Sequence, residues 1–104
     1  MTPYDNACIK FDYTKRRLAG LPIDVQLASI DEDIENLISI KKGEIAVKKR
    51  IVDMYLSNGL TPRHINLEED PHIMMLSIFK AMLCNERYRL SIKLLTRQLE
   101  TVEV

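Results

Sequence analysis

The clearest pattern of apolar and polar positions lies in the last third of the chain. After Asp70-Pro71, residues recur in alternating steps of four and three, and all but one of them are apolar or aromatic. This is the spacing of a heptad seam, the line along which helices of a coiled coil meet. The members of this heptad seam are Met74, Ile78, Ala81, Asn85, Tyr88, Ile92, Leu95 and Leu99. The spacing predicts a long helix over residues 71–100, started by an aspartate cap and a proline.

A second row of apolar residues widens the face of this helix. Its members are Leu76, Phe79, Leu83, Leu90 and Leu94. From Ile73 to Cys84 the helix is apolar almost all round, which predicts that its neighbours surround it and that the Cys84 thiol is buried. Either the first helix completes the cover of this wide face or a second chain does, and we favour a homodimer.

Asn85 is the one strongly polar member of the heptad seam. A buried asparagine in such a seam fixes the register or the number of helices that associate. Alternatively, the helix kinks or reaches solvent at this point.

The middle of the chain carries two apolar series that are out of phase. The first is Leu27, Ile30, Ile34 and Leu37, and the second is Ile40, Val47, Ile51 and Met54. The phase changes by one residue beside Gly43, and such a change accompanies a bend or a break in a helix. We therefore expect either one bent helix over residues 24–57 or two short helices, capped by Asp24 and ended at Gly59.

The first segment has clear helix boundaries. Thr2-Pro3 is a capping hydroxyl followed by a proline in the first turn, and Gly20 with Pro22 marks the end. These signals predict a helix over residues 3–18. With 104 residues and helices throughout, the chain is predicted to be a single all-α domain over residues 1–104. In this small helical bundle, helix 1 packs on a hairpin of the bent helix and the long C-terminal helix.

Charge is balanced overall but gathered in blocks. The chain has 15 basic and 15 acidic residues, yet residues 23–40 hold five acids and no base, whereas residues 41–60 hold five bases and two acids. Both blocks can be solvated helix faces, or they can attract a partner or a second copy. The candidate partner-binding residues are Lys41, Lys42, Lys48, Lys49 and Arg50 in the basic patch and Asp31, Glu32, Asp33 and Glu35 in the acidic patch.

Residues that could carry catalysis are sparse. His64, Glu68 and His72 have the spacing of metal ligands on one helix face, but Pro71 interrupts any helix through them. Glycine-rich phosphate loops and nucleophile motifs are missing from the sequence. We therefore expect no enzyme, no metal and no cofactor.

The stretch 50–67 contains a known pattern. Its first part, RIVDMYLSNGLTPRHI, resembles the helix-turn-helix of many bacterial regulators and recombinases. The resemblance implies that Ile51, Met54 and Tyr55 anchor the first helix, that Gly59 forms the turn and that Ile65 anchors the second helix. It also implies that Arg63 and His64 face bases and that Lys48, Lys49 and Arg50 contact phosphates. Three acids follow directly at positions 68–70, and their charge opposes binding to phosphates. DNA binding is therefore the alternative function.

These observations predict a small protein-interaction module that acts as an adaptor, inhibitor or chaperone through helical surfaces. Small helical proteins of this size are common among phage-encoded modulators and secretion chaperones, which is an association of fold only. The N-terminus lacks the layout of a signal peptide, and the longest apolar stretch is too short to cross a bilayer. We expect a cytoplasmic protein with a protein partner, and neither nucleic acid nor membrane as its target.

Overall fold

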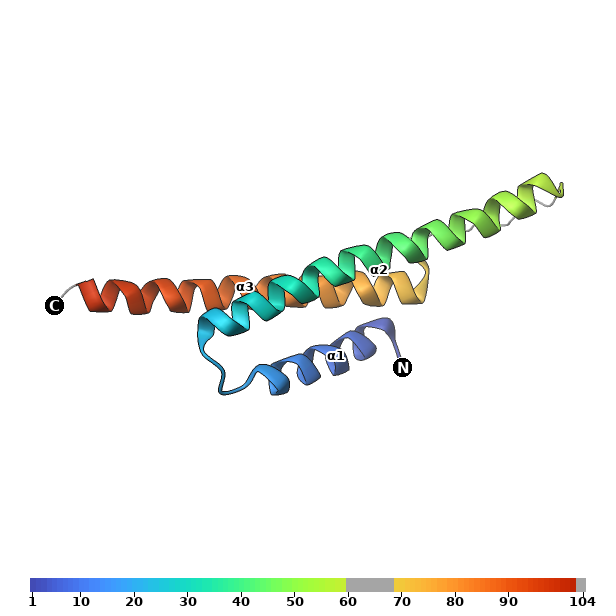
Figure 1. Cartoon of the computed structure of the whole chain (residues 1–104). Helices are drawn as coiled ribbons and strands as arrows, with labels where there is room; N and C mark the ends of the chain where they lie inside the picture. The colour runs from blue at the N-terminus through green and yellow to red at the C-terminus, as the bar shows by residue number, and fades with distance from the viewer. Residues whose placement is uncertain (60–68, 103–104) are drawn as a thin grey trace.

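The computed structural model describes residues 1–59 and 69–102, and it contains three helices (Figure 1). They are α1 (Pro3–Leu18), α2 (Ile23–Ser57) and α3 (Pro71–Val102). No strand occurs among the described residues. The predicted all-α bundle is confirmed, with α1 packed beside a long pair formed by α2 and α3.

The start of α1 follows from its first residues. The Thr2 hydroxyl accepts a hydrogen bond from the backbone N–H of Asp5 (3.1 Å), and the Asp5 carboxylate accepts one from the N–H of Thr2 (3.1 Å). This reciprocal pair satisfies two N–H groups at the start of the helix that would otherwise lack partners. Gly20 leaves the helix with φ +83°, a conformation that suits glycine.

The start of α2 differs from the prediction that Asp24 is its cap. Pro22 occupies the cap position, and its carbonyl accepts the N–H of Gln26 (3.0 Å). Because the helix has already begun at Ile23, Asp24 lies within the first turn, where its negative charge interacts favourably with the positive end of the helix dipole. The Gln26 side chain donates to the carbonyl of Leu21 (2.8 Å) and satisfies a group of the connecting turn.

The question of a break at Gly43 is resolved, because α2 is one continuous helix of 35 residues. The phase change in its apolar pattern has another cause. The first series faces α3, with Ile30 and Leu37 buried and Leu27 and Ile34 packed against the core. The second series is largely exposed from Ile40 onwards, since its residues lie on a different side of the same helix.

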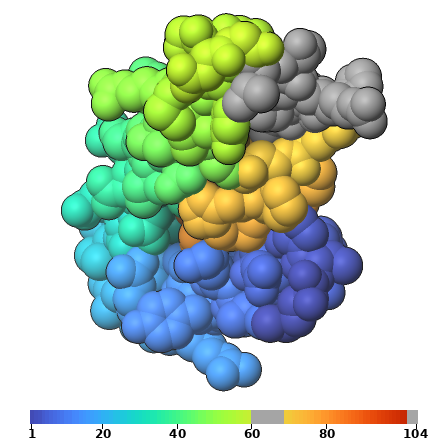
Figure 2. Space-filling view, turned by 90° about the vertical axis from the view of Figure 1, so that its right-hand side faces the viewer, coloured from blue at the N-terminus to red at the C-terminus, as the bar shows by residue number. Residues whose placement is uncertain are grey.

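Both other helices pack on α3. The buried apolar residues come from all three helices and include Ala7 and Leu18 of α1, Ile30 and Leu37 of α2, and Leu76, Leu83 and Leu90 of α3. Figure 2, viewed from one end of the molecule, shows α3 between α2 and α1. The core therefore uses the second row of α3, which the sequence placed beside the heptad seam.

The molecule is elongated, with extents of 72 × 25 × 18 Å and a radius of gyration of 18.9 Å. A compact domain of this length has a radius near ~13 Å. The extension arises because α2 and α3 are offset along each other (Figure 1). Lys48 still pairs with Asp70 at the start of α3, and Leu94 still packs against the core. Beyond them, residues 49–57 of α2 project past the start of α3, and residues 95–102 of α3 project past the start of α2. We call these projections the α2 arm and the α3 arm.

Asp70 is the cap of α3, as predicted. Its carboxylate accepts the N–H groups of His72 and Ile73 (both 3.0 Å) and forms an ion pair with Lys48 of α2. The bond to Lys48, followed by the N–H of Ile73, lowers the pKa of Asp70. One side chain thus starts α3 and ties it to α2.

Core and arm residues of the same type should differ in their effect on stability. Leu83 is fully buried and Leu56 of the α2 arm is 54% exposed. Leu83→Ala should lower the free energy of unfolding by about 2–5 kcal/mol, because it leaves a cavity among packed side chains. Leu56→Ala should change it by less than about 0.5 kcal/mol. Urea titration followed by circular dichroism measures both, and similar losses would contradict this core.

The charge of Asp70 should make stability depend on pH. Because the folded pKa is lowered, the stabilisation is complete above the unfolded value of about 3.9 and is lost as pH falls through the folded value. Asp70→Asn keeps a capping side chain and removes the charge, so it should be less stable by up to about 1 kcal/mol at pH 7. The two proteins should melt alike near pH 2. A difference that does not change with pH would show that the charge plays no part.

Candidate partner-binding surfaces

Most of the heptad seam lies on the side of α3 that faces away from α1 and α2, whereas its member Ile78 is partly buried and packs against the core. Leu83 and Leu90 fall two residues beyond seam positions, and two residues turn a helix by about 200°. With the core holding one side, the opposite side is open. The large seam residues are exposed, with Tyr88 at 69%, Leu95 at 58% and Leu99 at 64% of their full area.

The expectation that neighbours surround the first half of α3 is therefore wrong. Met74 is 37% exposed, and Ala81 and Cys84 are also exposed. The burial predicted for the Cys84 thiol is wrong for the same reason. Two helices that pack on one side of a third cannot cover its far side, so only the near side is enclosed, where Ile73 and Met75 are buried as well as Leu76 and Leu83. Asn85 also lies in solvent.

A second exposed apolar line runs along α2. Ile40, Val47, Ile51 and Met54 are 49%, 55%, 42% and 56% exposed, respectively. Their spacing of four and three continues the helix pattern, with Glu44 at the skipped position. This α2 line and the heptad seam are the two uncovered apolar surfaces on the long helices of the described chain.

Between α1 and α2 the chain forms an open groove of about 470 Å³. Its apolar lining consists of Ile9, Tyr13, Leu37, Ile40 and Phe79. The groove was not predicted from the sequence, although the exposed pair Ile9 and Tyr13, four residues apart on α1, is a signal of a second apolar side on that helix.

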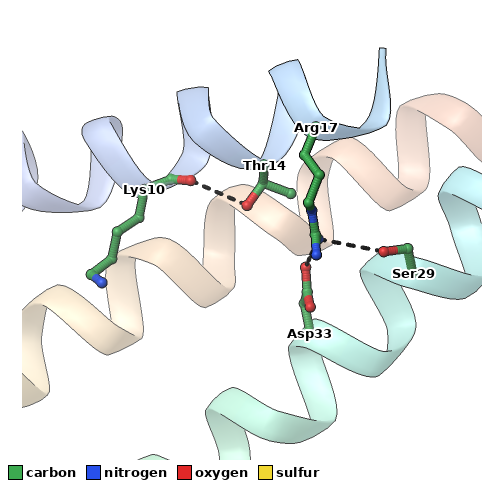
Figure 3. Close-up of polar contacts among 5 residues, drawn as sticks. All are labelled: Lys10, Thr14, Arg17, Ser29 and Asp33. Carbon is green, nitrogen blue, oxygen red and sulfur yellow. Dashed lines mark hydrogen bonds and ion pairs between the residues drawn. The ribbon is translucent and has the colours of Figure 1, made fainter. Parts of the chain in front are cut away.

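Polar contacts line one part of this groove (Figure 3). Arg17 reaches from α1 to α2, where it donates to the Asp33 carboxylate (2.8 Å) and to the Ser29 hydroxyl (3.4 Å). The buried Thr14 hydroxyl donates to the carbonyl of Lys10 (3.1 Å), so its polar atom is satisfied within α1. The contacts of Arg17 join α1 to α2 across this part of the groove.

The acidic patch is divided by the fold. Asp31 forms an ion pair with Arg87 of α3, and Asp33 forms one with Arg17 of α1. These two carboxylates therefore join helices and are less available to a partner. Glu32 and Glu35 are exposed, and neither has an ion pair within the described residues.

The basic patch is also divided. Lys48 pairs with Asp70, and Lys41 is half-buried. The three remaining members, Lys42, Lys49 and Arg50, are exposed, and none has an ion pair within the described part of the chain. They leave a basic surface on α2 that reaches onto the α2 arm.

Titratable groups do not gather into a reactive cluster where the structure is described. Across residues 1–59 and 69–102, no three histidine, cysteine or acidic side chains lie close enough to hold a metal ion. His72 lies 3.9 Å from a carboxylate oxygen of Glu44, whereas His64 and Glu68 lie outside the described residues. None of the helices, as far as they are described, has a stretch apolar and long enough to cross a membrane.

Only the first half of the helix-turn-helix resemblance lies in the described chain. Gly59 has φ +74°, as expected of a glycine that ends a helix. The anchors Ile51, Met54 and Tyr55 are each more than 40% exposed. Arg63, His64 and Ile65 lie outside the described residues.

Comparison with known proteins adds no assignment. Neither a family model, nor a curated protein, nor a solved structure matches this chain. Its function must be inferred from the surfaces described above.

Proposed function

We propose that this protein is a non-catalytic interaction module that binds another polypeptide through its exposed helical surfaces. The observation that supports this proposal is the uncovered heptad seam, where large apolar side chains such as Tyr88, Leu95 and Leu99 lie in one line in solvent. Exposed apolar surfaces of this kind mark protein interaction sites, because their contact with water is unfavourable.

The exposed bases of α2 add a second element to the proposal. Lys42, Lys49 and Arg50 can attract an acidic partner and orient its approach, whereas binding strength comes from apolar contact. Lys48 is a poor choice for testing this surface, since its replacement also removes the ion pair to the Asp70 cap.

Affinity capture tests the proposed interaction. The full chain and two variants serve as bait in a lysate of the source cell, with bound proteins identified by mass spectrometry. Leu95→Glu places a charge on the heptad seam, and Leu56→Glu makes the same change at a residue of similar exposure, 54% against 58%, on the α2 arm. The captured amount of a partner that binds the seam should fall at least about tenfold with Leu95→Glu, because an apolar contact is replaced by a buried charge.

Leu56→Glu should retain that partner, and Lys49→Glu should reduce its capture at low salt more than at high salt. A chain that recovers no polypeptide through the seam, including a second copy of itself, would contradict the proposal. Equal losses with Leu95→Glu and Leu56→Glu would point to general loss of solubility.

Retention on heparin distinguishes this proposal from the helix-turn-helix alternative. A DNA-binding protein that contacts phosphates is retained at low salt and released as salt rises. With no net charge and an acidic first half of α2, the chain should elute in the flow-through at about 50 mM salt. Retention that is lost in Lys49→Glu would favour nucleic acid over a polypeptide partner.

A further inference from the structure

We infer that the heptad seam of α3 binds a second copy of this chain, as a parallel and in-register two-stranded coiled coil. This inference rests on the proposed function and names its partner. Its four supports are the extent of the seam, the chemistry of its two flanks, the residues at its alternating positions, and Asn85.

The seam runs along most of α3. From Met74 to Leu99 it spans 25 residue steps, which correspond to about 38 Å of helix. Across a helix about 10 Å wide, the flat contact is roughly 400 Å² on each copy. The sum for two copies is on the order of 800 Å² before interdigitating side chains are counted, so these side chains must supply the rest of the roughly 1,000 Å² that a specific interface needs. Most of the seam also lies on the side of α3 that α1 and α2 leave open, and only its member Ile78 packs against the core.

The flanks of the seam favour an identical partner. One flank consists of the uncharged residues Ser77, Cys84, Ser91 and Gln98. On the other flank, Met75 is buried and Met82 packs against the core, so a partner can meet only Arg89 and Thr96 there. Arg89, the one charged residue among these eight, forms an ion pair with Glu86 of its own helix. Two copies therefore meet without like charges across the contact, whereas a strongly charged partner would find no complement there.

The alternating seam positions favour two parallel strands. In heptad notation, Ile78, Asn85, Ile92 and Leu99 occupy the a positions, and Met74, Ala81, Tyr88 and Leu95 occupy the d positions. β-Branched residues at a with leucine at d favour parallel dimers. Ile78, Ile92 and Leu95 follow this rule, whereas Leu99 at a and Met74, Ala81 and Tyr88 at d do not.

Asn85 selects the orientation. In a parallel in-register pair, the two Asn85 amides face each other, and each can donate to and accept from the other. In an antiparallel pair, a positions face d positions, so Asn85 would meet methionine, alanine, tyrosine or leucine. At three of these four it would lose its hydrogen bonds to water without replacement, which is unfavourable. The asparagine is exposed in the single chain, and the pair gives it a partner.

The parallel arrangement has a consequence for the α2 arms. Because each α2 arm projects past the start of its own α3, two parallel copies place both arms at the same end of the dimer (Figure 1). Each arm carries the exposed bases Lys49 and Arg50. An acidic partner with two matching sites would then bind both arms and gain affinity from the second contact.

Sedimentation equilibrium of the full chain tests the dimer. The chain has a mass of 12.1 kDa, and the expected species has twice that mass. Leu95→Glu should raise the dissociation constant at least about 100-fold, since it places an unpaired charge in the contact, and should leave the helical signal in circular dichroism unchanged. Leu56→Glu should leave the dissociation constant within about threefold, because Leu56 lies on the α2 arm, away from the seam.

A chain that stays at 12.1 kDa up to about 100 µM would overturn the dimer, because a functional pair with an uncharged apolar seam should form well below that concentration. If that monomer still captures another polypeptide through Leu95, the proposed function stands and this inference fails. If it captures none, both fail. If Leu95→Glu and Leu56→Glu raise the dissociation constant equally, the seam is not the contact between the two copies.

Cysteine cross-linking tests the orientation. In a chain with Cys8→Ser and Cys84→Ser, Asn85→Cys should form a disulfide between copies under mild oxidation, because equivalent a positions face each other only in the parallel register. Arg97→Cys, an exposed position outside the seam and its flanks, is the matched control and should remain reduced. A dimer in which Asn85→Cys does not cross-link, or cross-links no faster than Arg97→Cys, would overturn the parallel in-register pair.

Discussion

The structure depends on the packing of two helices against one side of α3. Leu83 and Leu90 are almost fully buried there, in one core with Ile30 of α2. Burying a leucine side chain contributes about 1.5–3 kcal/mol, so a row of such residues decides which side of α3 faces inwards. Since both other helices use this row, the opposite side of α3 remains open.

The offset of α2 and α3 along each other follows from the same packing. The acidic first half of α2 lies beside the second half of α3, where Asp31 meets Arg87, and the basic second half of α2 begins where α3 begins, with Lys48 on the Asp70 cap. These ion pairs are partly exposed and contribute little energy individually, but they agree with the apolar packing on how far the helices slide along each other. Both helix ends then project beyond their neighbours.

The offset gives the molecule two kinds of surface at once. Apolar side chains of the heptad seam and of the α2 line face solvent, while exposed bases such as Lys49 follow α2 onto its arm. A compact bundle of the same sequence would have enclosed more of the apolar residues. Their exposure is the physical reason to regard the chain as a binding module, because apolar surface in water favours association.

Local features of the sequence determined the helices themselves. Thr2 with Asp5, and Asp70 with Pro71, set two helix starts through hydrogen bonds within one turn, and Gly20 and Gly59 end helices because they adopt positive φ. The cap of α2 was misplaced by two residues, since Pro22 holds the cap position without a side-chain hydrogen bond and Asp24 lies in the first turn. The two apolar rows of α3 were also evident, because periodicity depends only on spacing.

Only the tertiary structure decided which apolar row is inside. The heptad seam and the second row of α3 have similar composition, and spacing alone ranks the seam first, yet α1 and α2 enclose Leu83 and expose Leu95. The phase change beside Gly43 likewise had two interpretations, one bent helix or two short helices. Since α2 is continuous, the change marks only a shift of the apolar residues to another side of the same helix. Periodicity reveals that a side is apolar but carries no information about which partner covers it. That choice comes from contacts between residues far apart in the chain, such as the ion pair of Arg17 with Asp33 and the common core that holds Ile30 and Leu83.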